Sequence, residues 1–416
     1  MNSYHKEGND KFRERCEKAL SWPKPDDWVL EKSLKIMKEC VRDQRKAARD
    51  LEAAICRHFH CAHAVSYTNC TSAIHASLFA LKVPPGSEVL VPSLTYWASV
   101  VPMLWHGLVP VFCDVEPDTL CISPQDAIGK ITPKTRGLIA VHLFGQMADM
   151  DRIQAIAKEN GLFLLEDASQ AFGAKYKSRM AGMIGDIGVF SFQASKHISA
   201  GEGGVLITDE HSLFERASCL GHYRRTGELE DVSLRMLSRT GLGFKFDIHP
   251  IAAELARDQL AKNDELNMGI YRDIETLETT LKKHPFISIP GTAPSAKRVY
   301  WTRFHVHYDP DKNNDTQIKT IRERLDSLGL ITFEEPTPYA RGLHREPLFT
   351  DPSFLECYSG HAAKALSTVQ KRTDRLPVTE ALSGSNVLTF PVFPSGDRSL
   401  MEEYAERLER AFAQEE

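Results

Sequence analysis

The stretch GVFSFQASKHISAGEGGVLITDE, residues 188–210, holds two short apolar runs separated by Lys196 and by three glycines within four positions. Each run has the length and the aromatic or β-branched content of a strand that is buried on both faces. A lysine belongs in water, yet nothing around Lys196 resembles a charged surface. Because burial lowers the pKa of a lysine and leaves a nucleophilic amine, the stretch predicts a sheet with a reactive group at a strand end.

The same pattern extends outward over residues 50–210, where apolar runs of strand length alternate with amphipathic segments of helical length. Two of these segments are TSAIHASLFALK, residues 71–82, and DMDRIQAIAKENG, residues 149–161. The alternation predicts an α/β fold in which helices sandwich a mainly parallel central sheet, with functional groups at the carboxyl ends of its strands. The apolar runs are HAVSYTN, EVLVPSL, VPVFCDV, GLIAVHLFG, LFLLED, IGVFSFQ and GVLITDE.

The pattern changes after residue 210. A charged helical segment over residues 251–284 is followed by shorter strand-like runs and by two terminal helical patterns. We therefore predict an N-terminal helical segment over residues 1–40 and a large α/β domain over residues 41–285. A smaller C-terminal α+β domain is expected over residues 286–416.

Composition excludes several classes of protein. The 416 residues have a net charge of −5, with 42% apolar and 26% charged residues, which favours a soluble protein without a nucleic acid partner. The polar N-terminus does not resemble a signal peptide, and no apolar run has the length of a membrane helix, so no membrane partner is expected. The nine cysteines are scattered and lack C-x-x-C spacing, which favours reduced thiols and a cytoplasmic location.

A metal site is the alternative raised by the segment CRHFHCAH, residues 56–63. Its cysteines and histidines are metal ligands by type, but they fall within one short connector before a strand. No second cluster in the sequence obviously completes a tetrahedral set. The sequence therefore does not predict a bound metal.

Three strand ends carry polar groups that complement one another. Taken singly, each has a structural explanation, because hydroxyl residues cap helices, acids follow strands and most lysines are solvated. Together they offer a helix N-terminus for a phosphate, a carboxylate for a pyridinium nitrogen and a buried amine for a Schiff base. The residues are Glu166 and Asp167 at the end of LFLLED, Thr71 and Ser72 after HAVSYTN, and Ser191 and Lys196 in the opening stretch.

Those three groups are the ones that pyridoxal 5′-phosphate requires. We therefore predict this cofactor and interpret Lys196 as the residue that binds it. The glycines after Lys196 are expected to admit a close backbone approach where a side chain would collide.

From about residue 45 to its end, the chain resembles the DegT/StrS family of fold-type-I, pyridoxal-phosphate-dependent aminotransferases. The segments that carry the likeness occur in the family's order, and several are long enough to make coincidence implausible. They are VPSLTYWAS, PVFCDVEPDTLCISP, AVHLFGQMADMD, EDASQAFGAKY, GDIGVFSFQASKHISAGEGG and HPIAAELARDQL.

The resemblance implies a role for each matching residue. Lys196 is expected to form the Schiff base and to move the proton between substrate and cofactor carbons, while Asp167 holds the pyridine nitrogen. Gln170 is expected near the 3-oxygen of the ring, and Tyr96 against the ring face. The phosphate ligands implied by the resemblance are Thr71, Ser72 and Ser191.

The segment GFKFDIHP departs from the family pattern. Many members have an asparagine there that reaches the cofactor phosphate of the neighbouring subunit, and Lys245 stands at its position. We predict that Lys245 serves the same anion as a point charge. Asp247 stands where an arginine is expected, which argues against anion binding at that position. Cys70 replaces the usual glycine beside the phosphate turn.

Five further residues are weighed for function. His344 resembles a family histidine near the substrate entrance and is the candidate substrate contact. Arg224 and Arg225 are candidate ligands for a diphosphate or a donor carboxylate, with a solvated basic loop as the preferred interpretation. Trp97 and Trp105 are expected to fill the core.

The resemblance implies transfer of an amino group from glutamine or glutamate to a ketone on a nucleotide-linked sugar or on a cyclitol such as scyllo-inosose. Such a reaction belongs to amino-sugar or aminoglycoside biosynthesis, and the family implies a homodimer with shared active sites. The alternative is a dehydratase similar to the 3-amino-5-hydroxybenzoate synthases, which keep the lysine. The 3-dehydrase branch has a histidine in place of the lysine, so Lys196 argues against it. Lys196, Asp167 and Gln170 together argue against a catalytically silent member.

Overall fold

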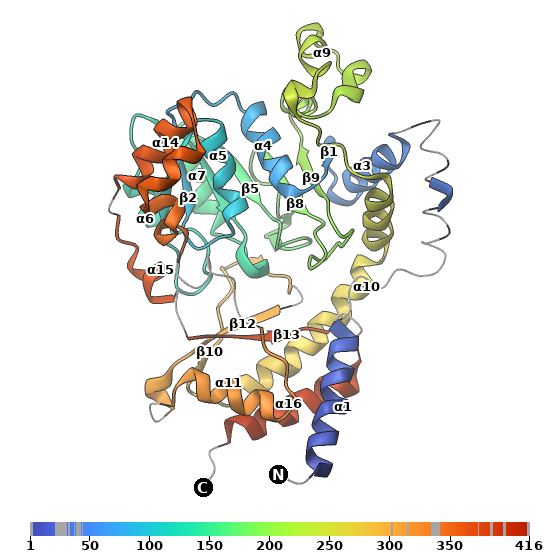
Figure 1. Cartoon of the computed structure of the whole chain (residues 1–416), viewed down its shortest axis with the longest axis vertical. Helices are drawn as coiled ribbons and strands as arrows, with labels where there is room; N and C mark the ends of the chain where they lie inside the picture. The colour runs from blue at the N-terminus through green and yellow to red at the C-terminus, as the bar shows by residue number, and fades with distance from the viewer. Residues whose placement is uncertain are drawn as a thin grey trace.

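The protein has two lobes in the computed structural model (Figure 1). The structure describes residues 3–20, 45–300, 303–313, 316–333, 342–372, 374–382, 386–393 and 397–413, together with scattered positions between 31 and 43. The larger lobe is built on a central sheet, and the smaller lobe contains both ends of the chain. Helix α10 (Pro250–Leu281) runs from the larger lobe into the smaller one.

The seven apolar runs form one seven-stranded sheet, in the order β1–β9–β8–β5–β4–β2–β3. Strand β9 is antiparallel to both of its neighbours, and the other adjacent pairs are parallel. The predicted α/β fold with a mainly parallel sheet is therefore confirmed. The strands are β1 (His63–Tyr67), β2 (Glu88–Pro92), β3 (Val109–Cys113), β4 (Thr135–Val141), β5 (Phe163–Asp167), β8 (Ile187–Ser191) and β9 (Gly204–Thr208).

Helices cover both faces of this sheet, because its strands are apolar on both sides. On the first side, here called the α3 face, lie α3 (Lys46–Phe59), α6 (Pro124–Gly129), α7 (Met150–Glu159) and the start of α10. On the other side, the α4 face, lie α4 (Cys70–Ala80), α5 (Val101–Trp105), α8 (His211–Ala217) and α14 (Gly360–Gln370). In β5, Leu164 packs on the α3 face and Leu165 on the α4 face. Since side chains alternate along a strand, Glu166 and Asp167 also face opposite sides.

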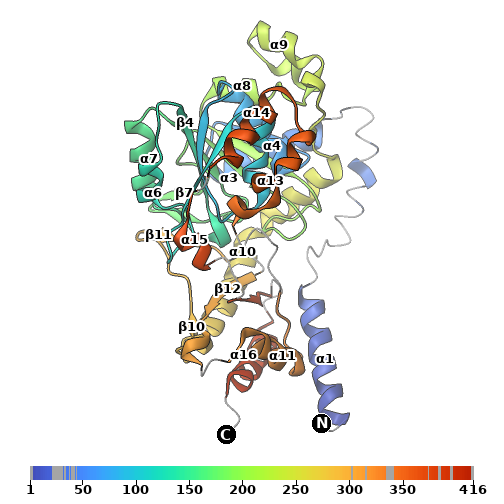
Figure 2. The ribbon, with the colours of Figure 1, turned by 60° about the vertical axis from the view of Figure 1, so that its left-hand side comes forward.

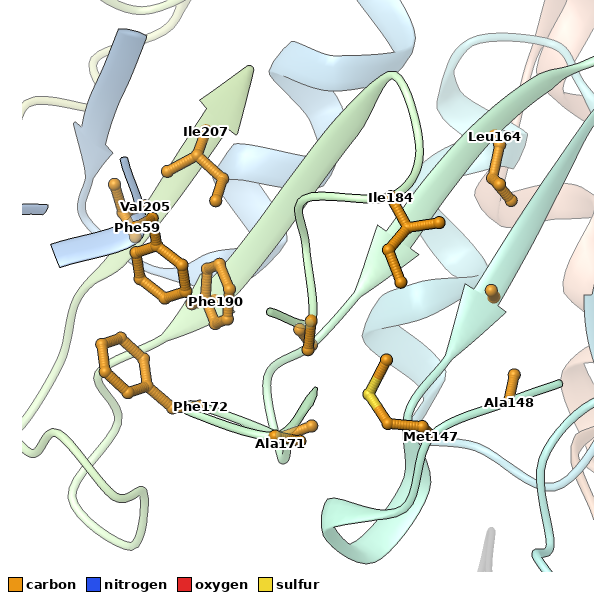
Figure 3. Packing of buried hydrophobic residues seen from close by; sticks show 14 of the residues in the cluster. Phe59, Met147, Ala148, Leu164, Ala171, Phe172, Ile184, Phe190, Val205 and Ile207 are labelled. Carbon is orange, nitrogen blue, oxygen red and sulfur yellow. The ribbon is translucent and has the colours of Figure 1, made fainter. Parts of the chain in front are cut away.

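Three phenylalanines stabilise the α3 face next to β8 and β9 (Figure 3). The ring of Phe59, the last residue of α3, lies 4.7 Å from that of Phe190 in β8 and 5.1 Å from that of Phe172. The rings of Phe172 and Phe190 are 5.3 Å apart. Val205 and Ile207 of β9 belong to the same buried cluster. Burial of each such side chain contributes about 1.5–3 kcal/mol, which holds the strands on either side of the loop 192–203 in place.

The smaller lobe combines segments that are far apart in the sequence (Figures 1 and 2). Helices α1 (Ser3–Leu20), α11 (Ile318–Ser327) and α16 (Arg398–Phe412) share one hydrophobic cluster with the second half of α10. They pack against an antiparallel sheet of β10 (Ile287–Ser288), β12 (Arg303–Tyr308) and β13 (Val387–Pro391). The α+β character predicted for the C-terminal region is confirmed.

The domain boundaries proposed at residues 40 and 285 stay a prediction. Hydrophobic packing joins chain segments across both positions. Phe12 and Cys16 of α1 lie in the same cluster as Leu408 of α16, and Leu366 of α14 packs on the α4 face of the larger lobe. The chain therefore returns to the larger lobe after β12 before it completes the smaller one.

Several short elements complete the described fold. A second small sheet consists of β6 (Lys175–Tyr176), β7 (Arg179–Met180) and β11 (Ala296–Lys297). Helix α9 (Val232–Ser238) projects from the larger lobe in Figure 1, and the C-terminal half adds α13 (Pro347–Thr350) and α15 (Pro377–Leu382). Among the described helices, none combines the length and the apolar character that crossing a lipid bilayer requires.

The two tryptophans that were expected to fill the core do not. Trp97 is 42% exposed and Trp105 is 60% exposed. Helix α5 has five residues and buries Met103 and Leu104 against the sheet. Its last residue, Trp105, turns outward against the ring of Tyr358, with 5.0 Å between the ring centroids. A helix this short buries one face against the sheet, and Met103 and Leu104 occupy that face in α5. Trp105 therefore lies at the surface.

Candidate functional site

A cavity of about 500 Å³ lies at the carboxyl ends of the parallel strands, on the α4 face of the sheet. Its walls come from the start of α4, the segment before α5, the loops after β5 and β8, and strand β12 of the smaller lobe. Six of the nine candidate residues selected from the sequence line it: Thr71, Tyr96, Asp167, Gln170, Ser191 and Lys196. The other three, which are Ser72, Lys245 and His344, do not belong to this lining.

The start of α4 forms one wall of the cavity. The side-chain oxygen of Asn69 caps the helix by accepting hydrogen bonds from the backbone N–H of Ser72, at 2.8 Å, and from the Ser72 hydroxyl, at 2.9 Å. The other N–H groups of a first turn have no partner within the helix, and the helix dipole there favours an anion. Thr71 lines the cavity beside them. This wall therefore has the donors that a phosphate group needs.

Strand β9 passes close to this helix start at Gly204. A Cβ atom at that position would lie 2.5 Å from the backbone nitrogen of Cys70 and 2.6 Å from the carbonyl carbon of Asn69. The expectation that a glycine after Lys196 admits a close backbone approach is confirmed here. Cys70 itself is buried, with its sulfur 3.1 Å from the Ser169 hydroxyl. The turn therefore accommodates a side chain at the position where glycine is usual in the family.

Ser72 lies in the same turn, but its hydroxyl is used by the fold. It donates to Asn69 and lies 3.2 Å from the Thr68 hydroxyl. Ser72 is buried, and its side chain belongs to the cap of α4. Its role as a phosphate ligand stays a prediction.

Asp167 lines the wall formed by the end of β5. One carboxylate oxygen accepts a hydrogen bond from the Ser99 hydroxyl, at 2.6 Å, and the other accepts one from the backbone N–H of Ser169, at 3.1 Å. The Ser99 hydroxyl lies 3.1 Å from that of Thr95. These bonds set the orientation of a buried carboxylate on the cavity wall, where it can pair with a protonated ring nitrogen.

Glu166, the preceding residue, lies on the α3 face and is fully buried. It accepts hydrogen bonds from His142 Nε2, at 2.9 Å, and from three backbone N–H groups in segment 182–185, at 2.5–3.0 Å. His142 Nδ1 accepts from the Ala148 N–H, which leaves the ring proton on Nε2. Burial alone would raise the pKa of Glu166, but the hydrogen bonds from His142 and from the backbone hold that pKa below its ordinary value. Glu166 is thus a structural group outside the cavity.

Lys196 lies in the loop between β8 and β9, half-buried against the cavity. Burial lowers the pKa of Lys196 to about 8, although the Asp167 carboxylate and the Cys70 thiol act in the opposite direction. The positive charge of Arg303 lowers it further. About a tenth of such an amine is neutral at pH 7, compared with well under a thousandth of an ordinary lysine. This is the environment of a nucleophilic amine.

Two candidate residues complete the wall around Asp167. The side-chain oxygen of Gln170 accepts a hydrogen bond from the backbone N–H of Phe144, at 3.0 Å, which orients its amide. Tyr96 is 42% exposed, and its ring lies 5.0 Å from that of Trp97, which also lines the cavity. A partly exposed aromatic ring in the lining can pack against a flat ring system.

Lys245 and His344 lie away from the cavity lining of their own chain. Lys245 is exposed, and its role across a homodimer stays a prediction. His344 Nδ1 lies 2.6 Å from the Ser93 hydroxyl, and its Nε2 lies 3.4 Å from Glu380. These contacts join the segment before α13 to the end of β2. Contact between His344 and a substrate likewise stays a prediction.

Arg225 is not part of a solvated basic loop, so that interpretation is wrong for this residue. Arg225 is buried, and its guanidinium donates to the buried carboxylate of Glu52 in α3. Arg225 neutralises that buried carboxylate, so its guanidinium is not available to bind a diphosphate. Arg224 lies 4.0 Å from Asp247, whose carboxylate accepts a hydrogen bond from His222 at 2.9 Å.

Among the residues of the site that were not selected from the sequence, three show why. Ser99, which orients Asp167, stands in the segment TYWAS, but nothing in that segment identifies its partner. Asn69 could have been recognised in the sequence, because an asparagine directly before a helix is a typical N-cap. Nothing in the sequence around Arg303 indicates its position, since it reaches the cavity from a strand of the other lobe.

The residues of the cavity fit pyridoxal 5′-phosphate. Lys196 provides an amine of lowered pKa, Asp167 an oriented carboxylate, and the start of α4 a set of phosphate donors. Because β9 passes so close to the start of α4 at Gly204, a residue with a side chain at that position would collide with the backbone of Asn69 and Cys70. Among the described residues, no three His, Cys, Asp or Glu side chains are grouped so that they could hold a metal ion.

Comparison with known proteins agrees with this geometry. The model of the DegT/DnrJ/EryC1/StrS aminotransferase family matches residues 30–395. GDP-perosamine synthase of Escherichia coli O157:H7 is 38% identical over 206 residues, so the match spans 50% of this chain and about half, 55%, of that protein. L-glutamine:2-deoxy-scyllo-inosose aminotransferase of Streptomyces kanamyceticus is 31% identical over 68% of each chain. The structure of S. venezuelae DesV in complex with a ketimine intermediate superposes with a TM-score of 0.76 and 26% identity, covering 94% of this chain and 96% of that one.

The family match includes every strand of the seven-stranded sheet and all nine candidate residues. The structural likeness extends over both lobes, in agreement with the fold type expected from the sequence. The site chemistry, the fold and the family model thus agree, and the chain belongs to the DegT/DnrJ/EryC1/StrS family of pyridoxal-phosphate-dependent aminotransferases.

Proposed function

We propose that this protein transfers an amino group from glutamine or glutamate to the ketone of a nucleotide-linked sugar or of a cyclitol such as scyllo-inosose. The observation that carries the proposal is that Lys196, Asp167 and the start of α4 line a single cavity. The names of the two relatives, a GDP-perosamine synthase and a scyllo-inosose aminotransferase, support these classes of acceptor. The second name also supports glutamine as the donor.

In this proposal, different walls of the cavity hold different parts of the cofactor. When bound, pyridoxal phosphate supplies an electron sink for the carbon that loses its proton. We assign Asp167 to the ring nitrogen, where its negative charge keeps the nitrogen protonated, and Ser99 to the orientation of Asp167. Gln170 is assigned to the ring's 3-oxygen and Tyr96 to the ring face. The phosphate ligands of the proposal are Thr71, Ser72 and Ser191, together with backbone N–H groups of α4.

Lys196 has two tasks in this proposal. Its neutral Nζ would hold the aldehyde carbon of the cofactor, and the amine of the donor would exchange with it there. As a free amine, Nζ would serve as the base for the proton on the α carbon of the donor and as the acid that returns this proton. The same atom would move the proton in the reverse sense with the ketone acceptor. A pKa of about 8 suits both directions, since the amine can lose and regain a proton near neutral pH.

Two further residues outside the cavity lining belong to the proposal, and one of them, Lys245, acts through the expected homodimer. Lys245 is exposed, and we assign it to the cofactor phosphate of the neighbouring subunit. His344 is assigned to the substrate entrance.

The absorbance of the bound cofactor tests the proposed function. Addition of L-glutamine or L-glutamate to the holoenzyme is expected to remove the visible band. A keto sugar or scyllo-inosose is expected to restore it, with an aminated product detectable by mass spectrometry. Lys196→Ala is the matched variant and is expected to give neither response. Restoration of the band without an aminated product would instead identify a dehydratase, and absence of any cofactor band would identify a silent protein.

A further inference from the structure

A second cavity, of about 430 Å³, lies at the opposite edge of the seven-stranded sheet from the proposed cofactor site. Its described lining comes from the residues that lead into β2, the starts of β3 and β4, and one side of α14. Because β2, β3 and β4 are parallel, their starts meet at one edge of the sheet and their carboxyl ends at the other. The five residues of β2 separate the two edges by about 15 Å. This second cavity, here named the amino-end cavity, is therefore distinct from the one that Lys196 lines.

Basic side chains predominate in the amino-end cavity. Lys134 and Arg136 reach it from the entry to β4, and His361 and Lys364 reach it from the first turns of α14. Among the residues that the structure describes, Lys134, Arg136 and Lys364 have no ion-pair partner. Three permanent positive charges thus line one cavity without a carboxylate to balance them.

Glu88 is the one acidic residue of the described lining, and its charge is already used by the fold. Its carboxylate accepts hydrogen bonds from Nη2 of Arg372, at 2.6 Å, and from the Thr132 hydroxyl, at 2.5 Å. Glu88 is buried and is balanced by Arg372, which does not belong to the lining. The cavity therefore keeps an excess of positive charge, which favours an anionic ligand.

Close backbone contacts hold the edge of the amino-end cavity in place. The N–H of Gly86 donates to the carbonyl oxygen of Gly107, at 2.8 Å, and the N–H of Glu88 donates to that of Lys134, at 3.0 Å. Gly107 has a φ of +69°, and a Cβ atom there would lie 2.7 Å from the Cβ of His361. A glycine at this position thus lets α14 approach the start of β3. The basic residues of the lining are therefore attached to segments that are joined to one another.

Two further features prepare this cavity for an anion. Nη1 of Arg136 donates to the carbonyl oxygens of Pro133 and Thr135, at 2.9 and 2.8 Å, which orients the guanidinium. A guanidinium has five N–H donors, so others remain for a ligand. The N-cap of α14, Ser359, makes no side-chain hydrogen bond to the first turn, and the helix dipole there also favours an anion.

We propose that the amino-end cavity binds a diphosphate group, either free or as part of a nucleoside diphosphate. A single phosphate monoester carries a charge of about −1.5 to −2 at pH 7, which is less than the charge of the three cations, whereas a diphosphate can engage all of them. The guanidinium of Arg136 can bind phosphate oxygens in pairs, and the two lysines add point charges.

The size and the remaining surface of the cavity agree with such a ligand. A volume of about 430 Å³ lies within the range of small-molecule sites. Pro85, Val109 and Ala365 give the lining an apolar part against which a nucleoside can pack. This binding site goes beyond the proposed aminotransferase function and does not depend on it.

Calorimetric titration of the holoenzyme with pyrophosphate tests the proposal. We expect Arg136→Gln and Lys364→Gln each to raise the dissociation constant about 3- to 10-fold, and the double variant to raise it about 10- to 100-fold. The matched control is the double variant Arg152→Gln/Lys371→Gln, which removes two positive charges from exposed residues outside the lining. Its dissociation constant is expected to match that of wild type.

Titration with UDP separates the two sources of the diphosphate. UDP can also enter the acceptor site, so the quantity compared is the affinity lost in Arg136→Gln/Lys364→Gln relative to the control double variant. A greater loss for UDP than for pyrophosphate would identify a nucleoside diphosphate as the ligand. An equal loss for both would identify the diphosphate group alone.

Thermal unfolding makes the result independent of the stability of the variants. Arg136 and Lys364 are exposed, so without an anion their variants are expected to have the wild-type Tm and wild-type amino transfer. Pyrophosphate is expected to raise the Tm of wild type and of the control, but not that of Arg136→Gln/Lys364→Gln. Absence of pyrophosphate binding in wild type, or an equal loss of affinity in the two double variants, would overturn the assignment. Failure of amino transfer in wild type would instead contradict the proposed function and leave this test unchanged.

Discussion

The last two residues of β5 have the same charge and lie side by side in the chain, yet they enter different regions of the molecule. Glu166 points into the α3 face, where His142 and three backbone N–H groups donate to its carboxylate. Asp167 points into the cavity on the α4 face, where Ser99 and Ser169 donate one hydrogen bond to each oxygen. A carboxylate can accept about four hydrogen bonds, so the first is saturated by its own fold and the second retains capacity for a ligand.

This difference separates stability from function at a single strand end. A carboxylate surrounded by fixed donors holds the loops that donate to it. A carboxylate with remaining acceptor capacity beside a cavity can act on whatever enters. Substitutions on the two sides of β5 should therefore change different measured quantities.

The largest effect is expected from Asp167→Asn. Asparagine has the same shape but no negative charge to keep the cofactor nitrogen protonated, so we expect kcat to fall at least 100-fold while some cofactor binding remains. Steady-state amino transfer measures the first quantity and visible absorbance the second. Glu166→Gln is the matched control, with kcat per folded molecule expected within about twofold of wild type. Normal turnover by Asp167→Asn would mean that another carboxylate faces the ring.

The second largest effect is expected from Glu166→Gln, and it concerns folding. The new NH₂ group must face backbone N–H donors of segment 182–185 or leave them unpaired, which should lower the free energy of unfolding by about 3 kcal/mol. Urea unfolding of the apoprotein measures this change. Asp167→Asn is the control here, since its amide oxygen can accept from the Ser169 N–H while its NH₂ group donates to the Ser99 hydroxyl. It should therefore stay within about 1 kcal/mol of wild type. A larger loss in Asp167→Asn than in Glu166→Gln would reverse the comparison.

The smallest effect concerns the pH at which Lys196 reacts. Because its folded pKa is lowered to about 8, the neutral fraction of the amine rises about tenfold per pH unit up to pH 8 and then levels off. The rate at which the apoprotein binds pyridoxal phosphate, followed by stopped-flow absorbance from pH 6 to 10, should have this profile. N-acetyl-lysine in place of the protein corrects for the titration of the aldehyde. A rate that keeps rising beyond pH 9 would show that the lysine is solvated like an ordinary one.

Much of the fold could be predicted because each buried strand appears in the sequence as a continuous apolar run. The seven apolar runs became the seven strands, since a strand covered on both faces must be apolar throughout. The antiparallel direction of β9 could not be predicted from that pattern, because a buried strand needs the same apolar side chains whether it runs parallel or antiparallel to its neighbours. The exposure of Trp97 and Trp105 was missed for a related reason, since an apolar side chain is not always a buried one.

The site could be predicted in part. The segments around Lys196 and Asp167 follow local rules for strand ends and helix starts, and six of the nine candidates line the cavity. Arg225 was misread because its partner Glu52 lies in α3, far away along the chain. Arg303 was overlooked because it reaches the cavity only through the packing of the smaller lobe on the larger one.

Two features could be read from the chain alone, namely the polar groups that follow its strands and the runs that form the sheet. Both follow from local requirements: side-chain chemistry at a strand end, and continuous apolar character in a buried strand. Tertiary packing is what directs Glu166 into the fold and Asp167 into the cavity, and it is also what brings Arg303 of β12 into the cavity lining. The physical reason is that hydrogen bonds, burial and charge act over a few ångströms, whereas the groups that supply them here are distant in the chain.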